Sequence, residues 1–161
     1  MLTQALTPAQ LSRLRNHLIR FSYKYGDKRI THKALRWLKN LNTSPFPKGT
    51  YLAIASEEKR LTGFILFGRY GLEEAYIVVH PDFRKRQVGE TLFKQTIDTL
   101  GRVYVRVACD NIPSLKLCFA LGLRAFSFTT GPTGKPTLCL GGGEWSEKEF
   151  HSHSQTHSPY K

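Results

Sequence analysis

The segment from residue 73 to residue 109 constrains the fold of this chain more than any other. A β-branched apolar run, EEAYIVVH (73–80), stops at Pro81, and helically spaced apolar residues then extend to residue 100. The strand pattern VYVRVAC (103–109) follows directly. A strand–helix–strand unit of this length predicts two parallel strands joined by a right-handed crossover. The fold must therefore contain a sheet with a helix packed against it.

Further elements flank this unit. The apolar spacing predicts a first strand at 2–6, a helix that begins at Thr7-Pro8, a helix that Thr31 caps, strands at 51–56 and 61–70, a helix at 111–122, and a hairpin of strands 124–130 and 135–140. The predicted fold class is α/β (α+β), with a mixed, mostly antiparallel central sheet of about seven strands and helices on both faces. We expect a single domain over 1–140 and a disordered tail over 141–161, because GGGEWSEKEFHSHSQTHSPYK looks too polar to pack.

Composition excludes several classes of protein. The 161 residues are 40% hydrophobic, which is enough for a core. No apolar run approaches the roughly 20 residues that span a bilayer, and the start, MLTQALTPAQ, does not resemble a signal peptide. The cysteines are odd in number and far apart, so we expect neither a disulfide framework nor a metal site. A cytoplasmic protein, monomeric or homodimeric, is the expectation, and the tract HSHSQTH (151–157) predicts nothing specific.

The positive charge is concentrated at the N-terminus. The formal net charge is +12, and residues 1–50 contain ten Lys or Arg but one acid, Asp27. Such an excess favours an anionic partner: a nucleic acid, a phosphorylated cofactor, an acidic acceptor or a membrane surface. A solvated basic face is the simpler interpretation, and both interpretations stay open.

The loop after the strand 73–80 is typical of an anion site. Three cations, Arg84, Lys85 and Arg86, stand where a strand ends and a helix begins, and the first amides of a helix lack partners. Gly89 has no Cβ, so that a ligand can approach the backbone closely. A pyrophosphate fits this pattern, although a basic loop before an ordinary helix fits it as well.

This segment resembles the acyl-CoA-binding motif of the GNAT family, the GCN5-related N-acetyltransferases. That motif places Arg or Gln, two residues, Gly, one residue and Gly or Ala after a strand that ends near Val-x-Pro. Val79, Pro81, Arg84 and Gly89 match it, whereas Gln87 replaces the first glycine. Because a side chain disfavours positive φ, we expect Gln87 to keep a negative φ if it holds the turn.

A second motif supports the resemblance, which covers residues 49–140. The family follows its fifth strand with Asn-x-x-Ala/Ser-x-x-Leu-Tyr and then Gly-Phe. Here Asn111, Ser114, Leu117, Cys118 and Gly122-Leu123 stand in that order. The +3 and +4 spacing places Asn111, Ser114 and Cys118 on one helical face. Asn111 either caps this helix or, as the family suggests, contacts the pantetheine arm.

The resemblance implies direct transfer of an acetyl group from acetyl-CoA, a co-substrate, to a primary amine on a small molecule or protein. No metal is implied. The implied cofactor-binding residues are the strand end and the loop with the following helix turn, together with the helix after the fifth strand: Ile77, Val78, Val79, Arg84, Lys85, Arg86, Gln87, Val88, Gly89, Glu90, Thr91, Asn111 and Ser114. The backbone N–H of Val79 is expected to polarise the thioester, and the amides from Gln87 to Thr91 to hold the pyrophosphate.

Two residues are candidates for proton transfer. Glu73 is the candidate base, because strand parity places it on the same face as Val79, and Glu74 is the weaker one. Cys118 occupies the place of the family's tyrosine acid, and its usual thiol pKa would suit the departing CoA thiolate. The alternative for Glu73 is a polar residue at the strand end, and for Cys118 a small buried side chain.

Two other functions remain as alternatives. One is a non-catalytic CoA-binding regulatory module, which the missing tyrosine and the missing glycine support. The other is a basic nucleic-acid-binding protein with a vestigial CoA site. Nucleic acid is the less favoured partner, because no helix-turn-helix spacing and no RNA-binding signature occur in the sequence. No membrane partner is expected.

Overall fold

The computed structural model describes residues 1–131 and 134–156 of the chain. In chain order the strands and helices are β1 (Leu2–Ala5), α1 (Pro8–Tyr25), α2 (His32–Asn40), β2 (Tyr51–Glu57), β3 (Arg60–Gly68), β4 (Glu74–Val79), α3 (Val88–Leu100), β5 (Arg102–Ala108), α4 (Ile112–Ala120), β6 (Arg124–Thr130), β7 (Pro136–Gly143) and α5 (Glu147–Thr156). Short 3₁₀ turns at Arg69–Gly71 and Pro81–Phe83 flank β4.

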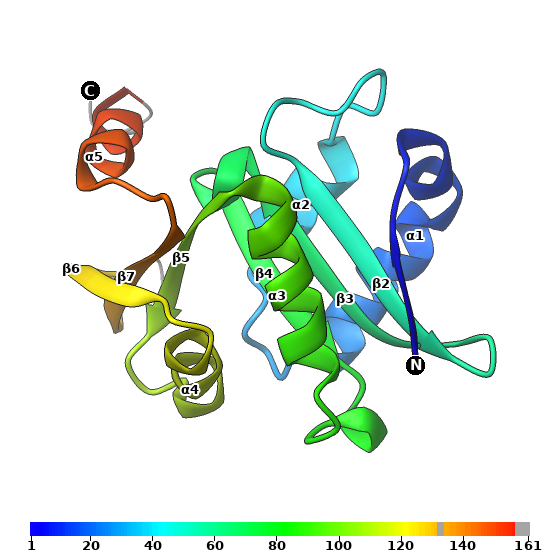
Figure 1. Ribbon diagram of the computed structural model, residues 1–161. Helices are drawn as coiled ribbons and strands as arrows, with labels where there is room; N and C mark the ends of the chain where they lie inside the picture. The colour runs from blue at the N-terminus through cyan, green and yellow to red at the C-terminus, as the bar shows by residue number, and fades with distance from the viewer. Residues whose placement is uncertain (132–133, 157–161) are drawn as a thin grey trace.

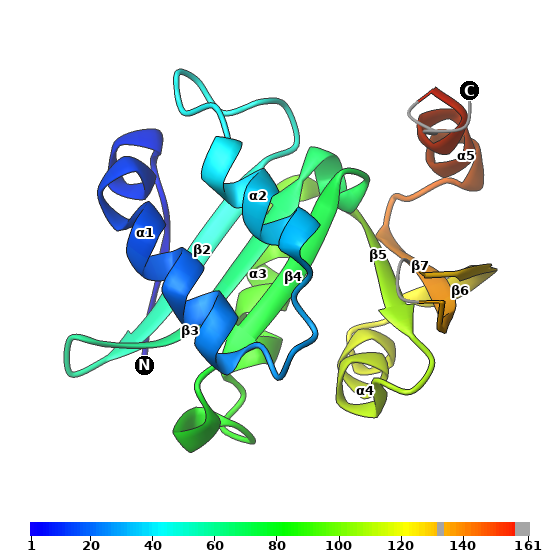
Figure 2. The same ribbon diagram turned by 180° about the vertical axis from the view of Figure 1, so that it is seen from behind.

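The expected fold class is confirmed, but the strands form two sheets. The first has the order β1-β2-β3-β4 and the second β5-β7-β6, and every pairing between described strands is antiparallel. Helices α1 and α2 cover one face of the first sheet, and α3 covers the other (Figures 1 and 2). The crossover β4-α3-β5 is present as predicted, yet no backbone ladder joins β4 to β5 within the described residues.

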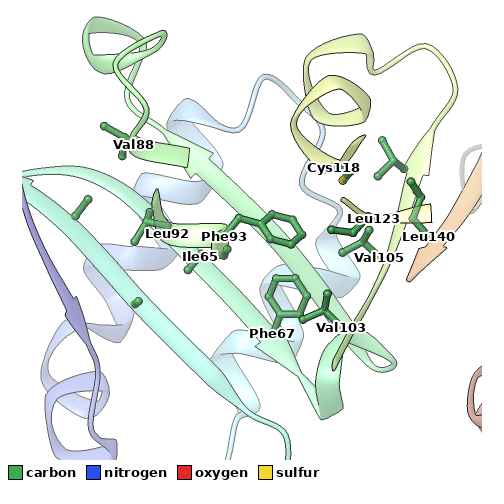
Figure 3. Close-up of a cluster of buried hydrophobic side chains, with 13 residues drawn as sticks. Ile65, Phe67, Val88, Leu92, Phe93, Val103, Val105, Cys118, Leu123 and Leu140 are labelled. Atoms are coloured by element: carbon green, nitrogen blue, oxygen red, sulfur yellow. The ribbon is translucent and has the colours of Figure 1, made fainter. Parts of the chain in front are cut away.

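Apolar side chains occupy part of the space where β4 and β5 separate. The core under α3 contains Phe67 and Phe93, whose ring centroids are 5.5 Å apart, together with Val105 of β5. Figure 3 shows this cluster continuing to Cys118 and Leu140 in the second half of the molecule. The two sheets therefore share one hydrophobic core although they share no hydrogen-bonded edge.

The first two helices begin as their sequences predict. The side chains of Thr7 and Thr31 accept hydrogen bonds from the backbone N–H groups of Gln10 and Ala34. In α1 the Gln10 Oε1 in turn accepts a bond from the Thr7 backbone N–H. Apolar residues of α1 and α2 form a second core against the far face of β2, β3 and β4. Their polar faces are left to solvent.

The expectation of a disordered tail from Gly141 is wrong for residues 141–156. Strand β7 continues to Gly143, and α5 follows. The glycines serve close packing: a Cβ on Gly141 would lie 2.3 Å from the Trp145 ring. Phe150 is buried against Tyr104. Residues 157–161, with the last histidine of the tract, lie outside the described residues.

A partly buried ion pair also holds α5 in place. The Glu149 carboxylate accepts two hydrogen bonds from the Arg102 guanidinium, at 2.8 and 2.9 Å, and a third from the Tyr104 hydroxyl. The Arg102 bonds lower the pKa of Glu149. Because α5 carries one buried aromatic ring and one ion pair, it is an integral part of the second sheet's outer layer.

Phe150→Ala should lower the free energy of unfolding by about 3 kcal/mol or more, because a buried phenylalanine would be replaced by a cavity. Urea unfolding followed by circular dichroism measures this. Lys148→Ala in the same helix removes an exposed side chain and should change stability by less than about 0.5 kcal/mol. Equal stability of the parent and the Phe150 variant would show that α5 is not docked.

No described helix combines the length and the apolar character that crossing a membrane requires. The described residues also contain no cluster of three or more His, Cys, Asp or Glu side chains able to hold a metal ion.

Candidate active site between β4 and β5

A cavity of about 180 Å³ occupies the gap between the two sheets. Residues of β4, β5 and α4 supply most of its wall, and β3, α3 and the loop after α1 supply the rest. Its lining residues include Ala75, Ile77, Arg106, Asn111, Ser114 and Cys118. Four of them, Ile77, Asn111, Ser114 and Cys118, were predicted from the sequence, and the structure brings them together.

The free edge of β4 faces this gap. The N–H of His80 bonds to the Thr62 carbonyl of β3 at 2.8 Å. Since N–H and C=O directions alternate along an antiparallel strand, both groups of Val79 point away from β3. The Val79 carbonyl accepts a bond from Arg84 Nε at 3.1 Å, which agrees with that direction. The N–H of Val79 therefore faces the unpaired edge, as the expected thioester-polarising donor must.

The N-terminus of α3 lies beside the end of β4 and has no side-chain cap. Gln87 is its N-cap residue and makes no capping hydrogen bond. The amides of Val88, Gly89 and Glu90 lie in the first turn, where intrahelical partners are absent. The amide of Thr91 already bonds to the Gln87 carbonyl at 3.0 Å. The Thr91 amide is therefore not available to a ligand, and the expected cradle of amides from Gln87 to Thr91 loses this last member.

The space around Gly89 is shaped for a ligand that approaches the backbone. A Cβ at this position would lie 3.5 Å from Ile77 Cδ1, 3.6 Å from Val79 Cγ2 and 3.7 Å from Leu117 Cδ2, all ordinary contacts. The fold itself could accept alanine there. A larger side chain would extend between the end of β4 and α4, and the uncapped amides together with this opening fit the pyrophosphate and pantetheine parts of a coenzyme A.

The expectation that Gln87 keeps a negative φ is wrong. Its φ is +64°, in the left-handed region, and Lys85 has φ +62° in the same loop. The loop thus adopts, at a residue with a side chain, a backbone conformation that glycine takes up more readily. Such a backbone costs of order 1 kcal/mol or more for a residue with a Cβ.

Gln87→Gly should raise the free energy of unfolding by about 0.5–1 kcal/mol, because glycine adopts φ +64° without the Cβ clash. Thermal unfolding measures the change. Arg86→Gly is the matched control: Arg86 is absent from the positive-φ residues, so its replacement should destabilise the chain. Destabilisation by both substitutions would contradict the observed loop geometry.

The three cations of the loop have different surroundings. Arg84 ties the loop to α1: its guanidinium donates to the carbonyls of Val79 and Tyr25 and pairs with Asp27 at 2.9 Å. Arg86 lies over the Phe83 ring and pairs with Glu57 at 3.9 Å, whereas Lys85 is exposed and forms no ion pair with a described residue. Of the three, Lys85 is thus the side chain best placed to reach a bound phosphate, and Arg84 shapes the loop.

Three other predicted binding residues contribute through their backbone or stand apart. Val78 and Val88 are buried in the two cores, so their side chains cannot reach a ligand. Glu90 is exposed in the first turn of α3, where its carboxylate favours the helix dipole. The sequence could place these residues at the site but could not separate backbone from side-chain roles.

Helix α4 forms the opposite wall of the cavity. Asn111 stands at its N-cap position without a side-chain capping bond, so the capping interpretation is not supported, and its side chain lines the cavity with Ser114. Cys118 is 2% exposed, and this burial raises the pKa of its thiol to about 11. The pKa of Cys118 therefore no longer matches that of the CoA thiol, as an ordinary cysteine pKa would. Cys118 is a buried core residue that also lines the cavity.

The two glutamates have different surroundings in the structure. Strand β4 begins at Glu74, so strand parity does not extend to Glu73, whose carboxylate accepts a bond from Trp37 Nε1 of α2 at 3.3 Å. Glu74 bonds to the N–H of Ala75 at 3.4 Å, on the free edge of β4. Burial raises the pKa of Glu74. The hydrogen bond from Ala75 and the positive charges of Lys33 and Arg106 lower it by less.

A family model described as the acetyltransferase (GNAT) family matches residues 12–122. The chain belongs to the GNAT acetyltransferase family. The match includes β4, the loop, α3 and α4, and hence the whole site. No curated protein matches the chain.

Several solved structures align with this GNAT protein over nearly their whole length. The ribosomal-protein-alanine N-acetyltransferase from Brucella melitensis aligns with TM-score 0.64 and 15% identity over 89% of this chain and 99% of its own. A putative acetyltransferase from Salmonella typhimurium, solved with its cofactor acetyl-CoA, aligns with TM-score 0.63 and 15% identity, over 91% of this chain and 95% of its own. An aminoglycoside 6'-acetyltransferase type Ii aligns with TM-score 0.65 and 16% identity, over 91% of this chain and 99% of its own.

These similarities establish the fold of the GNAT protein and leave its acceptor undetermined. The neighbours are named for acceptors as different as a ribosomal protein and an aminoglycoside, yet their TM-scores hardly differ. The choice of acceptor therefore depends on the side chains around the cavity and not on the fold.

Proposed function

We propose that this protein transfers an acetyl group from acetyl-CoA directly to a primary amine on a small molecule or protein. The observation that carries the proposal is the convergence of the uncapped N-terminus of α3, the free edge of β4 and the cavity wall of α4. The GNAT membership and an acetyl-CoA-bound neighbour of the same fold support it.

The chain's own groups would hold the donor at three points. The amides of Val88, Gly89 and Glu90 bind the pyrophosphate, with help from the exposed Lys85. Asn111 and Ser114 provide polar groups along the pantetheine arm. The acetyl thioester supplies the activated acyl group, and the N–H of Val79 polarises its carbonyl oxygen. Donor and acceptor are thereby held in one cavity, which favours reaction by proximity.

Glu74 takes the proton of the attacking amine in this proposal. It directly precedes Ala75, which lines the cavity, and its raised pKa makes it a stronger base than an exposed carboxylate. One water molecule is enough to bridge the carboxylate and the amine. The CoA thiolate leaves beside α4, where the thiol of Cys118 retains its proton at neutral pH.

An acceptor with an acidic group suits the cavity best. Two arginines, Arg29 and Arg106, are among its lining residues, and none of those residues is an aspartate or glutamate. Asp110 pairs with Arg29 at 2.8 Å, and the Arg106 guanidinium lies over the Phe150 ring. An anionic group next to the amine would therefore share Arg29 with Asp110.

Calorimetric titration with acetyl-CoA, followed by release of free CoA in the presence of an amine panel, tests the proposal. The panel should pair each amino acid or amino sugar with its decarboxylated or neutral analogue. Micromolar binding and amine-dependent CoA release, faster with the acidic members, are expected. Binding without release by any amine would favour a regulatory CoA-binding module, and absence of binding would refute the site altogether.

A further inference from the structure

The surface of α1, α2 and their connecting loops carries an excess of positive charge that the acetyl-transfer site does not use. Eight cationic residues are exposed there, and none of them forms an ion pair with a described residue: Arg13, Arg20, Lys24, Lys28, Lys33, Arg36, Lys39 and Lys48. The one acid of residues 1–50, Asp27, is already paired with Arg84.

The other two cations of this region have structural roles. Arg15 Nη1 donates to the carbonyls of Leu38, Lys39 and Leu41 at the end of α2. Arg29 pairs with Asp110 at 2.8 Å. The structure therefore separates cations that hold the fold from cations that remain available, and six of the eight available ones lie on α1 and α2, with Lys28 and Lys48 in the loops that follow these helices. A surface made only for solubility would mix both signs of charge.

The spacing of the basic residues on α1 suits a polyanion. Arg13, His17, Arg20 and Lys24 follow one another at intervals of four, three and four residues, so they form a single stripe with rises of about 6, 4.5 and 6 Å. Helix α2 lies beside α1 on the same face of the sheet, which widens the stripe into a surface (Figure 2). Tyr23, 73% exposed on α1, offers an aromatic face next to this stripe.

We propose that this basic face of α1 and α2 binds the phosphate backbone of a nucleic acid. Regularly spaced Arg and Lys side chains with an exposed aromatic ring are the combination that holds a phosphodiester chain and stacks a base. Insertion into a membrane does not fit, because the apolar residues of α1 and α2 are buried against β2, β3 and β4.

The nucleic-acid surface and the coenzyme site lie on different sides of the first sheet. Helices α1 and α2 cover one face, whereas α3, whose N-terminus forms the coenzyme site, covers the other (Figures 1 and 2). Both sites can therefore be occupied at once. The inference stands on the charge distribution alone and does not depend on acetyl transfer.

Fluorescence anisotropy with a labelled single-stranded RNA of about 20 nucleotides, and with a duplex of equal length, tests this inference at 50–200 mM salt. We expect log Kd to rise with log salt with a slope of about 3, for about four neutralised phosphates. Arg13→Glu combined with Arg20→Glu should weaken binding at least about tenfold and reduce this slope by about 1 to 2.

Lys94→Glu combined with Lys148→Glu is the matched control. Both of these lysines are exposed on other helices, so this variant lowers the net charge of +12 by the same amount as the α1 variant. Melting temperature and acetyl-CoA titration check that both variants are folded. Preserved RNA binding in the control supports a site on α1 and α2.

Three results would overturn the proposal. Equal losses in the two variants would indicate attraction by net charge alone. Equal or tighter binding of polyglutamate would assign the face to an acidic protein, and preferential binding of phosphatidylserine vesicles would assign it to a membrane surface. Absence of RNA binding at 50 mM salt would refute it directly.

Discussion

Gly89→Trp is expected to raise the Kd for acetyl-CoA at least about 100-fold, which corresponds to about 2.7 kcal/mol. The indole would extend from the first turn of α3 toward Ile77, Val79 and Leu117. That direction leads into the opening between the end of β4 and α4, where the pantetheine arm is proposed to pass. Isothermal titration of the parent and the variant with acetyl-CoA measures the loss.

Gly89→Ala is the control that separates blocking from misfolding. Its Cβ would meet its three nearest neighbours at 3.5–3.7 Å, and the family motif accepts alanine at this place. We expect the alanine variant to bind acetyl-CoA within a few fold of the parent and to be about 0.5–1 kcal/mol more stable, because alanine restricts the unfolded chain. If the tryptophan variant is folded and binds normally, the coenzyme does not pass this opening.

Glu74→Gln should lower kcat/KM for the amine about 10²–10³-fold while leaving the Kd for acetyl-CoA unchanged, because an amide cannot accept the amine proton. The glutamine Oε1 can still accept the hydrogen bond from Ala75, so the local structure should persist. Initial rates over a pH series measure the effect. The acid limb of the parent's kcat/KM profile should lie above the usual glutamate pKa of 4.5, since burial raises the pKa of Glu74.

The same pKa shift predicts the direction of a stability change. Folding raises the pKa of this carboxyl above its usual value of 4.5. Between pH 4.5 and the raised pKa, the folded state therefore holds the proton more often than the unfolded state does. Stability from this group is therefore present at low pH and is lost as pH rises through the raised pKa. At pH 7 the neutral side chain of Glu74→Gln should make the protein more stable than the parent.

Glu73→Gln is the matched substitution one residue earlier. Its side chain accepts a bond from Trp37 on α2, and glutamine can still accept it, so activity should change by less than about threefold. A large loss with Glu73→Gln and none with Glu74→Gln would reverse the assignment of the base. Equal small effects would show that the amine loses its proton without a carboxylate.

Much of the secondary structure could be predicted, because local signals decide it. Thr7 and Thr31 were identified as caps from residue type alone, and both make the expected hydrogen bonds. Alternating and helical apolar spacing located the strands and helices to within a few residues. The tail is the exception: its polar composition predicts disorder from Gly141 onward, whereas Trp145 packs over Gly141. Packing against a residue without a side chain leaves no periodic pattern in the sequence.

The site was predictable in position and less so in detail. Motif spacing brought Ile77, Asn111, Ser114 and Cys118 to one cavity, as expected. It could not show that Arg84 is engaged by Val79, Tyr25 and Asp27, since these partners are distant in the chain or belong to the backbone.

The sequence by itself determined the β-α-β crossover, the basic loop before α3 and the concentration of cations in the first 50 residues, since these depend on residue type and spacing. The tertiary structure alone decided that β4 and β5 separate around Phe67 and Phe93. It also decided the surroundings of the two glutamates: Glu73 accepts a bond from Trp37, whereas Glu74 accepts one from the N–H of Ala75, a residue that lines the cavity. Directions and burial arise from packing between distant segments, and a linear pattern does not contain them.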